Sequence, residues 1–191
     1  MKFVLKTLIL LTILHAAAFS HLQAQESSVP VVPITYRNDN NKYSVSYPAN
    51  WLKKDVAKLD LFISPPLKKE EQSGPATVNF TSEEVPSDIN LTEFYNESVK
   101  SLTNELKNVK IESTGDRILD GVKTRWIVYT HVLQSITYKV MQIFIINYSH
   151  LYLITASAPA EDFDLYRPEF ESVISTFKFE FIEKQTQKSK T

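Results

Sequence analysis

The stretch that decides the fold is residues 122–158, VKTRWIVYTHVLQSITYKVMQIFIINYSHLYLITASA. It contains three strand-like segments, 122–133, 136–148 and 151–158, which are separated by very short breaks. The middle segment is apolar at both its odd and its even positions, and the third segment has a similar two-sided character. A strand that is apolar on both faces is typical of the centre of a sheet with cover on both sides. Residues 122–158 therefore predict adjacent antiparallel strands that need a covering layer on each face.

An amphipathic helix precedes this stretch. Apolar side chains recur at three- and four-residue spacing from Leu91 to Leu106, while charged residues occupy other positions. This spacing predicts a helix of about four turns with one buried face. Asn90 or Thr92 could cap its N-terminus. The helix is one candidate for covering the sheet.

A second apolar stripe follows the stretch, from Phe163 to Phe177. Pro168 lies inside it, and a proline removes a backbone donor and clashes with the preceding turn. We therefore expect Pro168 to end a short first helical segment, and a second segment to begin at about Glu169. The two helical regions are the only candidates for cover, one on each face of the sheet.

Four further strand-like segments complete the pattern, at residues 43–47, 59–64, 78–85 and 109–119. The last of them ends in Asp120-Gly121, which is a strong signal for a tight turn between two strands. The order is three strands, a helix, four strands and a helix. This order predicts an α+β protein, a three-layer α/β/α sandwich with a central, mainly antiparallel sheet and one helix on each face.

The N-terminus has the layout of a secretory signal peptide. Lys2 and Lys6 are followed by an apolar run over residues 8–14 and then by small residues. The apolar run is shorter than the roughly 20 residues that a membrane span needs. We therefore interpret residues 1–24 as a signal peptide, with cleavage after Ala24 or, as alternatives, after Ala18 or Ser20. The protein is expected to be exported, periplasmic or secreted, with no transmembrane span after cleavage.

The rest of the chain divides into three parts. Residues 25–41 are polar and contain Pro30 and Pro33, so we expect a flexible leader. Residues 183–191 are polar and lysine-rich, so we expect a disordered tail. The folded domain is predicted to span residues 42–182.

The composition excludes several functional classes. The 191-residue chain has no cysteine, which excludes disulfides, Cys-ligated metal centres and a thiol nucleophile. Its 3 glycines form neither a Walker loop nor a dinucleotide-binding fingerprint. Loss of Lys2 and Lys6 with the signal peptide changes the formal net charge from −1 to −3. A mildly acidic domain has no electrostatic reason to bind nucleic acid.

Two histidines, His131 and His150, lie outside the predicted signal peptide. A serine hydrolase would need a serine, a histidine and an acid brought together, and the chain has no Gly-x-Ser-x-Gly motif. A metal site would need both rings near one point together with carboxylates. We interpret both residues as surface histidines at strand ends, and we expect no catalytic residue, no metal and no cofactor.

One group of side chains is a candidate docking surface. Tyr129 and Tyr138 share predicted strands with the basic residues Arg125 and Lys139, and His131 lies on the strand of Tyr129. An exposed patch of this kind can mark an interaction site, whereas the default interpretation is an ordinary outer face of the sheet. The docking surface is therefore a hypothesis that depends on exposure.

Three local motifs occur in order along the chain: Tyr43-Ser-Val-Ser-Tyr-Pro-Ala-Asn-Trp51, then Asp120-Gly121 followed by Trp126, and then Leu151-Tyr-Leu-Ile-Thr-Ala-Ser-Ala158 leading to Phe163, Tyr166, Phe170 and Ser175-Thr-Phe177. In this order, over about residues 42–179, they resemble the PsbP-like superfamily. That superfamily includes extrinsic lumenal proteins of plant photosystem II, exported bacterial proteins of the DcrB type and a Ran-binding nuclear-import factor. The resemblance implies a non-enzymatic accessory or assembly factor. The sparse histidines allow no metal-site residue of the plant proteins to be placed here, so the calcium binding associated with the family is not carried over.

These observations predict an exported, non-catalytic PsbP-like binding or assembly module. It would act through a protein partner, as an accessory factor of an envelope or membrane-associated complex. The alternative is a small-ligand-binding protein or an unrecognised hydrolase with its site at the sheet edge. That alternative predicts a pocket with His131 or His150 beside a carboxylate.

Overall fold

The computed structural model describes residues 32–180, so the predicted signal peptide (1–24) and tail (183–191) lie outside the described residues. Within this range the chain forms two helices and ten strands. In chain order they are β1 (Pro33–Asn38), β2 (Tyr43–Pro48), β3 (Leu52–Lys54), β4 (Leu61–Ser64), β5 (Thr77–Glu84), α2 (Leu91–Glu105), β6 (Lys110–Leu119), β7 (Val122–Leu133), β8 (Ile136–Asn147), β9 (His150–Pro159), α3 (Phe163–Ser175) and β10 (Lys178–Phe179).

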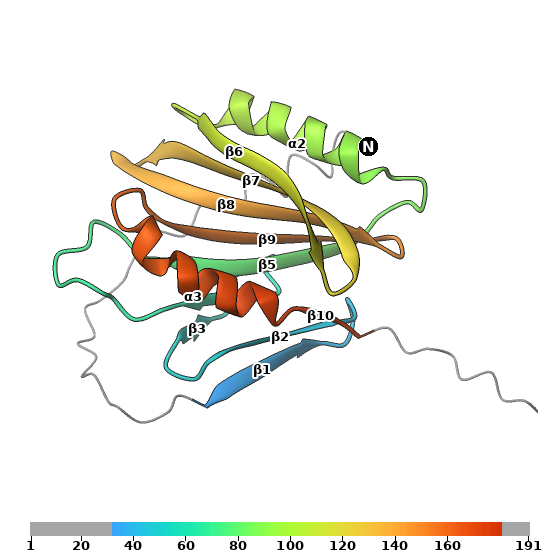
Figure 1. Ribbon diagram of the computed structural model, residues 1–191, viewed down its shortest axis with the longest axis horizontal. Coiled ribbons are helices and arrows are strands. Elements are labelled where there is room, and N and C mark those ends of the chain that lie inside the picture. The colour runs from blue at the N-terminus through green and yellow to red at the C-terminus, as the bar shows by residue number, and fades with distance from the viewer. Residues whose placement is uncertain (1–31, 181–191) are drawn as a thin grey trace, which may run out of the picture.

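The main sheet has seven strands in the order β3-β4-β5-β9-β8-β7-β6, and every neighbouring pair is antiparallel. The β7-β8-β9 meander of residues 122–159 supplies three of its inner strands (Figure 1). The side chains of β8 are buried on both faces, with Ile143 and Ile145 on one and Val140 and Phe144 on the other. The expectation of an antiparallel sheet with cover on both sides is confirmed.

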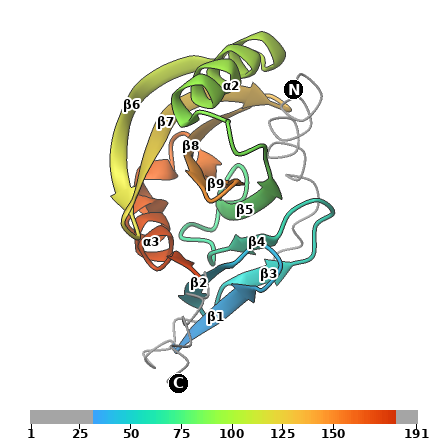
Figure 2. The same ribbon diagram turned by 90° about the vertical axis from the view of Figure 1, so that its right-hand side faces the viewer.

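One helix covers each face of the main sheet, α3 on one side and α2 on the other (Figure 2). Phe170 and Ile174 of α3 belong to one buried cluster, and Tyr95 and Leu102 of α2 belong to a second cluster. The three-layer α/β/α arrangement is therefore confirmed. The structure adds a small antiparallel sheet, β1-β2-β10, whose central strand β2 packs against α3.

The prediction of a flexible leader over residues 25–41 is wrong for its last part. Residues 33–38 form strand β1, which pairs along its whole length with β2. Pro33 is the first residue of an edge strand, a position where the missing N–H needs no partner. Tyr36 packs on Tyr43, with ring centroids 6.0 Å apart. The folded domain therefore begins about ten residues earlier than residue 42 suggests.

Two-residue turns join the consecutive strands from β6 to β9, and the central residues of these turns all have positive φ. Asp120-Gly121 (φ 45° and 79°) joins β6 to β7, as the sequence predicts. Gln134-Ser135 (49° and 71°) and Tyr148-Ser149 (46° and 60°) make the same kind of turn without glycine. Such turns match the right-handed twist of the strands they join. The last two hold non-glycine residues in a conformation that costs free energy.

The two helices differ in how well the sequence predicts them. Asn90 caps α2, since its side chain accepts hydrogen bonds from the N–H groups of Thr92 and Glu93. The break expected at Pro168 is wrong, because α3 continues from Phe163 to Ser175 with Pro168 inside it. A proline costs a helix about 3 kcal/mol. Burial of the five apolar side chains of α3 outweighs this cost, since each contributes roughly 1.5–3 kcal/mol.

Candidate functional site

The two described histidines lie at opposite ends of the sheet. His131 is opposite Tyr138 near the β7–β8 turn, and His150 is opposite Asn147 at the β8–β9 turn. The intervening length of β8 separates them by roughly 30 Å at about 3.3 Å per residue. They cannot share a metal ion, and residues 32–180 contain no group of three or more His, Cys, Asp or Glu side chains placed to hold one.

His131 is a core residue, so its interpretation as a surface histidine is wrong. It is 3% exposed and its ring lies 6.0 Å from Tyr129 and 6.2 Å from Tyr138. Burial lowers its pKa below the ordinary value, because the charged imidazolium would lose its hydration. His150 is half-buried, with Nδ1 3.1 Å from the carbonyl oxygen of Tyr148.

The predicted docking surface is wrong for three of its five residues. Tyr129 and Tyr138 are 0% and 5% exposed, and His131, 3% exposed, contacts both rings. Helix α2 packs on this face of β7 and β8 and buries them together with Tyr95. Alternating tyrosine and histidine side chains look like an outer face in the sequence, but their rings carry enough apolar surface to form a core.

The two remaining residues of that prediction lie on opposite sides of the sheet. The Arg125 guanidinium lies 4.4 Å from the ring centroid of Tyr95 on the α2 side, and its Nε lies 3.3 Å from Asp116. The Lys139 ammonium lies 5.5 Å from the ring centroid of Phe163, which begins α3. The five residues therefore do not form one surface.

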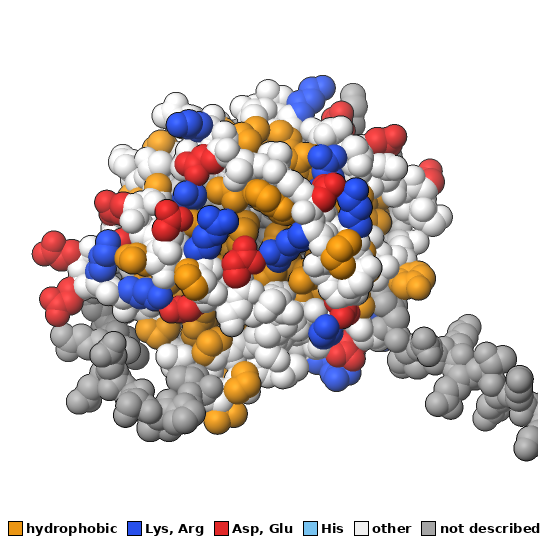
Figure 3. Space-filling view, in the orientation of Figure 1, with side chains coloured by type: hydrophobic (Ala, Val, Ile, Leu, Met, Phe, Trp, Pro, Cys, Tyr) orange, Lys and Arg blue, Asp and Glu red, His pale blue; other side chains and the backbone are white. Residues whose placement is uncertain are grey.

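Lys139 instead belongs to a set of charged side chains that joins the sheet to α3. We call this set the charged strip: Glu112, Arg117, Lys139, Asp164 and Glu171. Lys139 Nζ lies 3.0 Å from Glu112 and 3.7 Å from Asp164, and Arg117 Nη1 lies 2.7 Å from Glu171. The strip thus links the edge strand β6 and the central strand β8 to α3. Figure 3 shows Lys and Arg interspersed with Asp and Glu on this face, with apolar side chains between them.

Trp126 lies beside the charged strip. It lies on β7 opposite Gly115 of β6, and Gly115 is two residues from Arg117 along that strand. Trp126 is only partly buried. The Arg117–Glu171 side chains are 25% and 39% exposed and the Lys139–Glu112 side chains 18% and 34%, so water partly screens both pairs and their contribution to stability is modest. Arginine and tryptophan are the residue types that most often dominate binding at protein interfaces. The chemistry of the strip is therefore that of a recognition surface.

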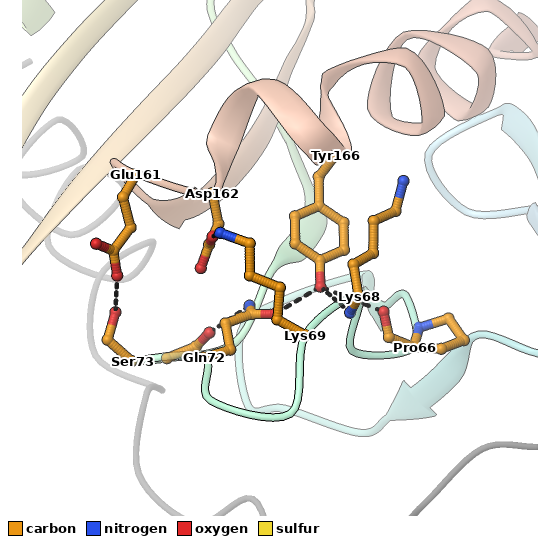
Figure 4. A network of polar contacts seen from close by, with 9 residues as sticks. Pro66, Lys68, Lys69, Gln72, Ser73, Glu161, Asp162 and Tyr166 are labelled. Carbon is orange, nitrogen blue, oxygen red and sulfur yellow. Dashed lines mark hydrogen bonds and ion pairs between the residues drawn. The ribbon is translucent and has the colours of Figure 1, made fainter.

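A network of polar contacts fixes the β4–β5 loop on the first turn of α3, at one end of the strip (Figure 4). The backbone N–H of Lys68 donates to the Tyr166 hydroxyl at 2.9 Å, and that hydroxyl donates to Gln72 Oε1 at 2.6 Å. The Lys69 ammonium pairs with the carboxylate of Asp162, which is itself buried. These contacts hold the start of α3, and with it Asp164, in a fixed position.

The sequence gives no signal for the charged strip. Arg117 and Glu171 are 54 residues apart and belong to a strand and a helix that do not adjoin in sequence. Neither residue has a local motif around it. Lys139 is the one member of the strip that the sequence indicates as a candidate docking residue. The sequence groups it, however, with side chains that do not form one surface with it.

Comparisons with known proteins agree with this fold. A family model described as PsbP-like protein matches residues 15–179. The solution structure of CyanoP from Synechocystis sp. PCC 6803 has 16% identity and a TM-score of 0.59, and the match covers 83% of this chain and 98% of CyanoP. LpqN of Mycobacterium tuberculosis, involved in cell envelope biogenesis, has 11% identity and a TM-score of 0.60, with 81% and 87% of the two chains covered.

A third similar structure is the Ran-binding protein Mog1p of Saccharomyces cerevisiae, with 10% identity and a TM-score of 0.53 over 78% of this chain and 96% of Mog1p. At these identities the structures establish the fold alone. No curated protein sequence is significantly similar to the chain. Within residues 32–180, neither helix has the length and apolar character needed to cross a membrane.

Proposed function

Because the chain belongs to the PsbP-like protein family, we propose that it is an exported, non-catalytic binding or assembly module. It serves as an accessory factor of an envelope or membrane-associated complex and needs no cofactor. The observation that carries the proposal is the charged strip with Trp126 beside it, since this surface combines recognition chemistry with little value for stability. The signal-like N-terminus and the similarity to LpqN, involved in cell envelope biogenesis, support the location.

The strip suits a protein partner of mixed charge. It contains both signs, and the carboxylates of Glu171 and Glu112 are 39% and 34% exposed, so groups of a bound protein can reach them. The neighbouring edge strand β6 is ten residues long and mostly exposed. Its charged side chains, such as Lys110 and Asp116, discourage unspecific strand pairing, so contact is left to side chains that recognise a particular partner.

The hydrolase alternative has less support. The hydroxyl of Ser82 donates directly to the carboxylate of Asp60, and Tyr43 donates to the same oxygen at 3.2 Å. A serine nucleophile would instead need a histidine between itself and the acid. His131, buried against the rings of Tyr129 and Tyr138, is not available for that role.

The test is recovery of a partner from the native envelope with a charge reversal in the strip. Arg117→Glu would place two carboxylates together at Glu171 and repel a partner that relies on the strip. Arg37→Glu is the control, because Arg37 forms an ion pair of the same type with Glu180 at 2.8 Å on the small sheet, away from the strip. After mild cross-linking, we expect the same partner with the wild type and Arg37→Glu, and at least about ten-fold less with Arg117→Glu.

Cell fractionation is part of the same experiment. The protein should be recovered outside the cytoplasm, with a mature N-terminus following Ala24. Recovery in the cytoplasmic fraction would overturn the exported location. Recovery as free protein alone, or a partner retained equally by Arg117→Glu and Arg37→Glu, would overturn the role of the strip.

A further inference from the structure

The outer edge of β6 is the longer of the two edges of the main sheet. Strand β6 is the last in the strand order, so within residues 32–180 no strand pairs with its outer side (Figure 2). It has ten residues, contains no proline and exposes most of its side chains. The opposite edge is β3, which has three residues. An open edge as long as β6 is a template on which another strand can pair.

Two exposed isoleucines lie on the same face of β6. Ile111 is 40% exposed and Ile118 is 65% exposed. They are seven residues apart, so in a regular strand they would lie on opposite faces. The pairing with β7 shifts its register between Ile111 and Ser113, and as a result Ile111 lies opposite Tyr129 and Ile118 opposite Lys123. Positions 123 and 129 share one face of β7, the face that α2 covers, so the two isoleucines share it as well.

We propose that two copies of the protein form a symmetric dimer by antiparallel pairing of β6 with β6, with Gly115 opposite Gly115 on the two-fold axis. The two main sheets then join into one. In this register Thr114 lies opposite Asp116, and beyond the register shift Ile111 lies opposite Ile118 of the second copy. The symmetry makes each of these contacts twice. Apolar pairs that face each other across two strands stabilise the pairing.

The charged residues of β6 select this register. Residues opposite each other must share a face, so the axis of a symmetric pair passes through a residue. With Thr114 on the axis, Lys110 would lie opposite Arg117. With Asp116 or Arg117 on the axis, that residue would lie opposite its own copy. Like charges directly opposite each other are destabilising, and with Gly115 on the axis none are.

The α3 face of the paired strands is complementary in charge. Glu112 and Arg117 lie on this face, because they contact Lys139 and Glu171, which belong to the charged strip. In the proposed register Arg117 of one copy lies opposite Ser113, and beside Glu112, of the other. Strand β6 has two basic and two acidic side chains, so the two edges have no net charge by which to repel each other.

Trp126 lies where the centre of this interface would be. Its indole covers Gly115, so the two indoles would approach the axis from either side with no side chain between them. A glycine inside a strand often marks a place where another backbone approaches closely. Covering two partly buried tryptophans would give the interface an apolar centre.

The dimer goes beyond the proposed function and does not depend on it. A two-fold axis perpendicular to the sheet keeps the α3 helices of both copies on the same side. Lys139 lies on β8, and Asp164 and Glu171 lie on α3, so these parts of each charged strip are away from the paired edge. Two strips would therefore face the same side and stay open to a partner.

Sedimentation equilibrium of the protein purified from its native host tests the proposal. We expect a monomer–dimer equilibrium over about 1–300 μM. Ile118→Lys should raise the dimer dissociation constant at least about ten-fold, because it places a charge against Ile111 in both symmetric contacts. Ile118 is largely exposed, so the monomer should keep the circular dichroism spectrum of the wild type. Ile34→Lys is the matched control: Ile34 is a 44% exposed isoleucine on β1, an edge strand of the small sheet, and its substitution should leave the dimer unchanged.

A double variant tests the register. Ile111→Glu alone should weaken the dimer as Ile118→Lys does. The variant that carries both Ile111→Glu and Ile118→Lys should recover most of the wild-type affinity, because each new carboxylate then lies opposite a new ammonium group of the other copy. A pairing in another register would give no such recovery.

Four results would overturn the inference: a monomer at every concentration, a dimer that Ile118→Lys leaves intact, a dimer that Ile34→Lys dissociates, or a double variant that stays monomeric. The proposed function can fail separately, since Ile118 lies on the α2 face and the charged strip on the α3 face. A dimer from which no envelope partner is recovered would keep the inference and contradict the proposed function. A partner recovered with a strictly monomeric wild type would do the reverse.

Discussion

The indole ring of Trp126 lies over Gly115 on the neighbouring strand, so closely that a Cβ built on Gly115 would be 2.6 Å from the ring atom Cζ2. The glycine is therefore required by the tryptophan and not by the backbone, since its φ is not positive. This pair holds Trp126 flat on β6 beside the charged strip.

Gly115→Ala should consequently displace the indole and destabilise the protein by about 1–3 kcal/mol, the usual range for an added group in a packed site. Urea unfolding followed by tryptophan fluorescence measures the change. Ser113→Ala, on the same strand and exposed, is the control and should stay within about 0.5 kcal/mol of the wild type. Equal stability of both variants would show that Trp126 can move aside at no cost.

Glycine substitutions in the two glycine-free turns of the meander should increase the stability of the protein. Ser149→Gly relieves a positive φ of 60°, and Ser135→Gly relieves one of 71°. The strain of about 1–2 kcal/mol per residue is partly offset by the greater freedom of glycine in the unfolded chain. We expect each variant to gain about 0.5–1 kcal/mol in urea unfolding. Gly121→Ser, at φ 79°, is the reverse change and should lose a similar amount.

Tyr166→Phe should loosen the β4–β5 loop. The ring keeps its place in the core, but the Lys68 N–H and the Gln72 side chain lose their shared hydroxyl partner. We expect a loss of about 1–2 kcal/mol and faster amide hydrogen exchange over residues 66–73. Tyr47→Phe, which changes another buried tyrosine, should leave exchange in this loop unchanged. Unchanged exchange in Tyr166→Phe would mean that the lysine contacts alone hold the loop.

Burial of His131 predicts a loss of stability in acid. Its pKa is lowered in the folded state, whereas the unfolded chain takes up a proton near the ordinary value of 6.5. As the pH falls through about 6.5, the unfolded state therefore binds the proton first, and this contribution to stability is lost. His131→Phe keeps a ring between Tyr129 and Tyr138 but cannot titrate.

The measurement is the free energy of unfolding at pH 7.5 and at pH 5. The decrease between the two should be smaller in His131→Phe than in the wild type. An identical pH dependence in His131→Phe would show that the buried ring becomes protonated without cost.

Local patterns were sufficient where a side chain's role depends on its chain neighbours. The caps and turns are of this kind: Asn90 bonds to Thr92 and Glu93, and Asp120-Gly121 closes a hairpin. The two-sided apolar pattern of β8 likewise required cover on both faces, and α2 and α3 supply it. These features follow from short-range geometry and from periodicity, which the sequence displays directly.

Local patterns failed where a distant element decides. Pro33 and Pro168 are both strong local signals against regular structure. Pairing with β2 nevertheless places Pro33 in a strand, and core packing keeps Pro168 inside a helix. The sequence predicts an exposed position for Tyr129 and His131 because it does not show that α2 packs on this face of the sheet.

The sequence by itself thus determined the α/β/α layering, because apolar periodicity requires each face of the sheet to be covered. The tertiary structure alone decided which polar and charged residues meet. Arg117 reaches Glu171, and Asn79 lies opposite Thr155, through the folding of segments more than 50 residues apart. Their attraction is too weak, and their separation in the chain too long, to leave a local pattern; it is burial of the apolar faces that brings them together.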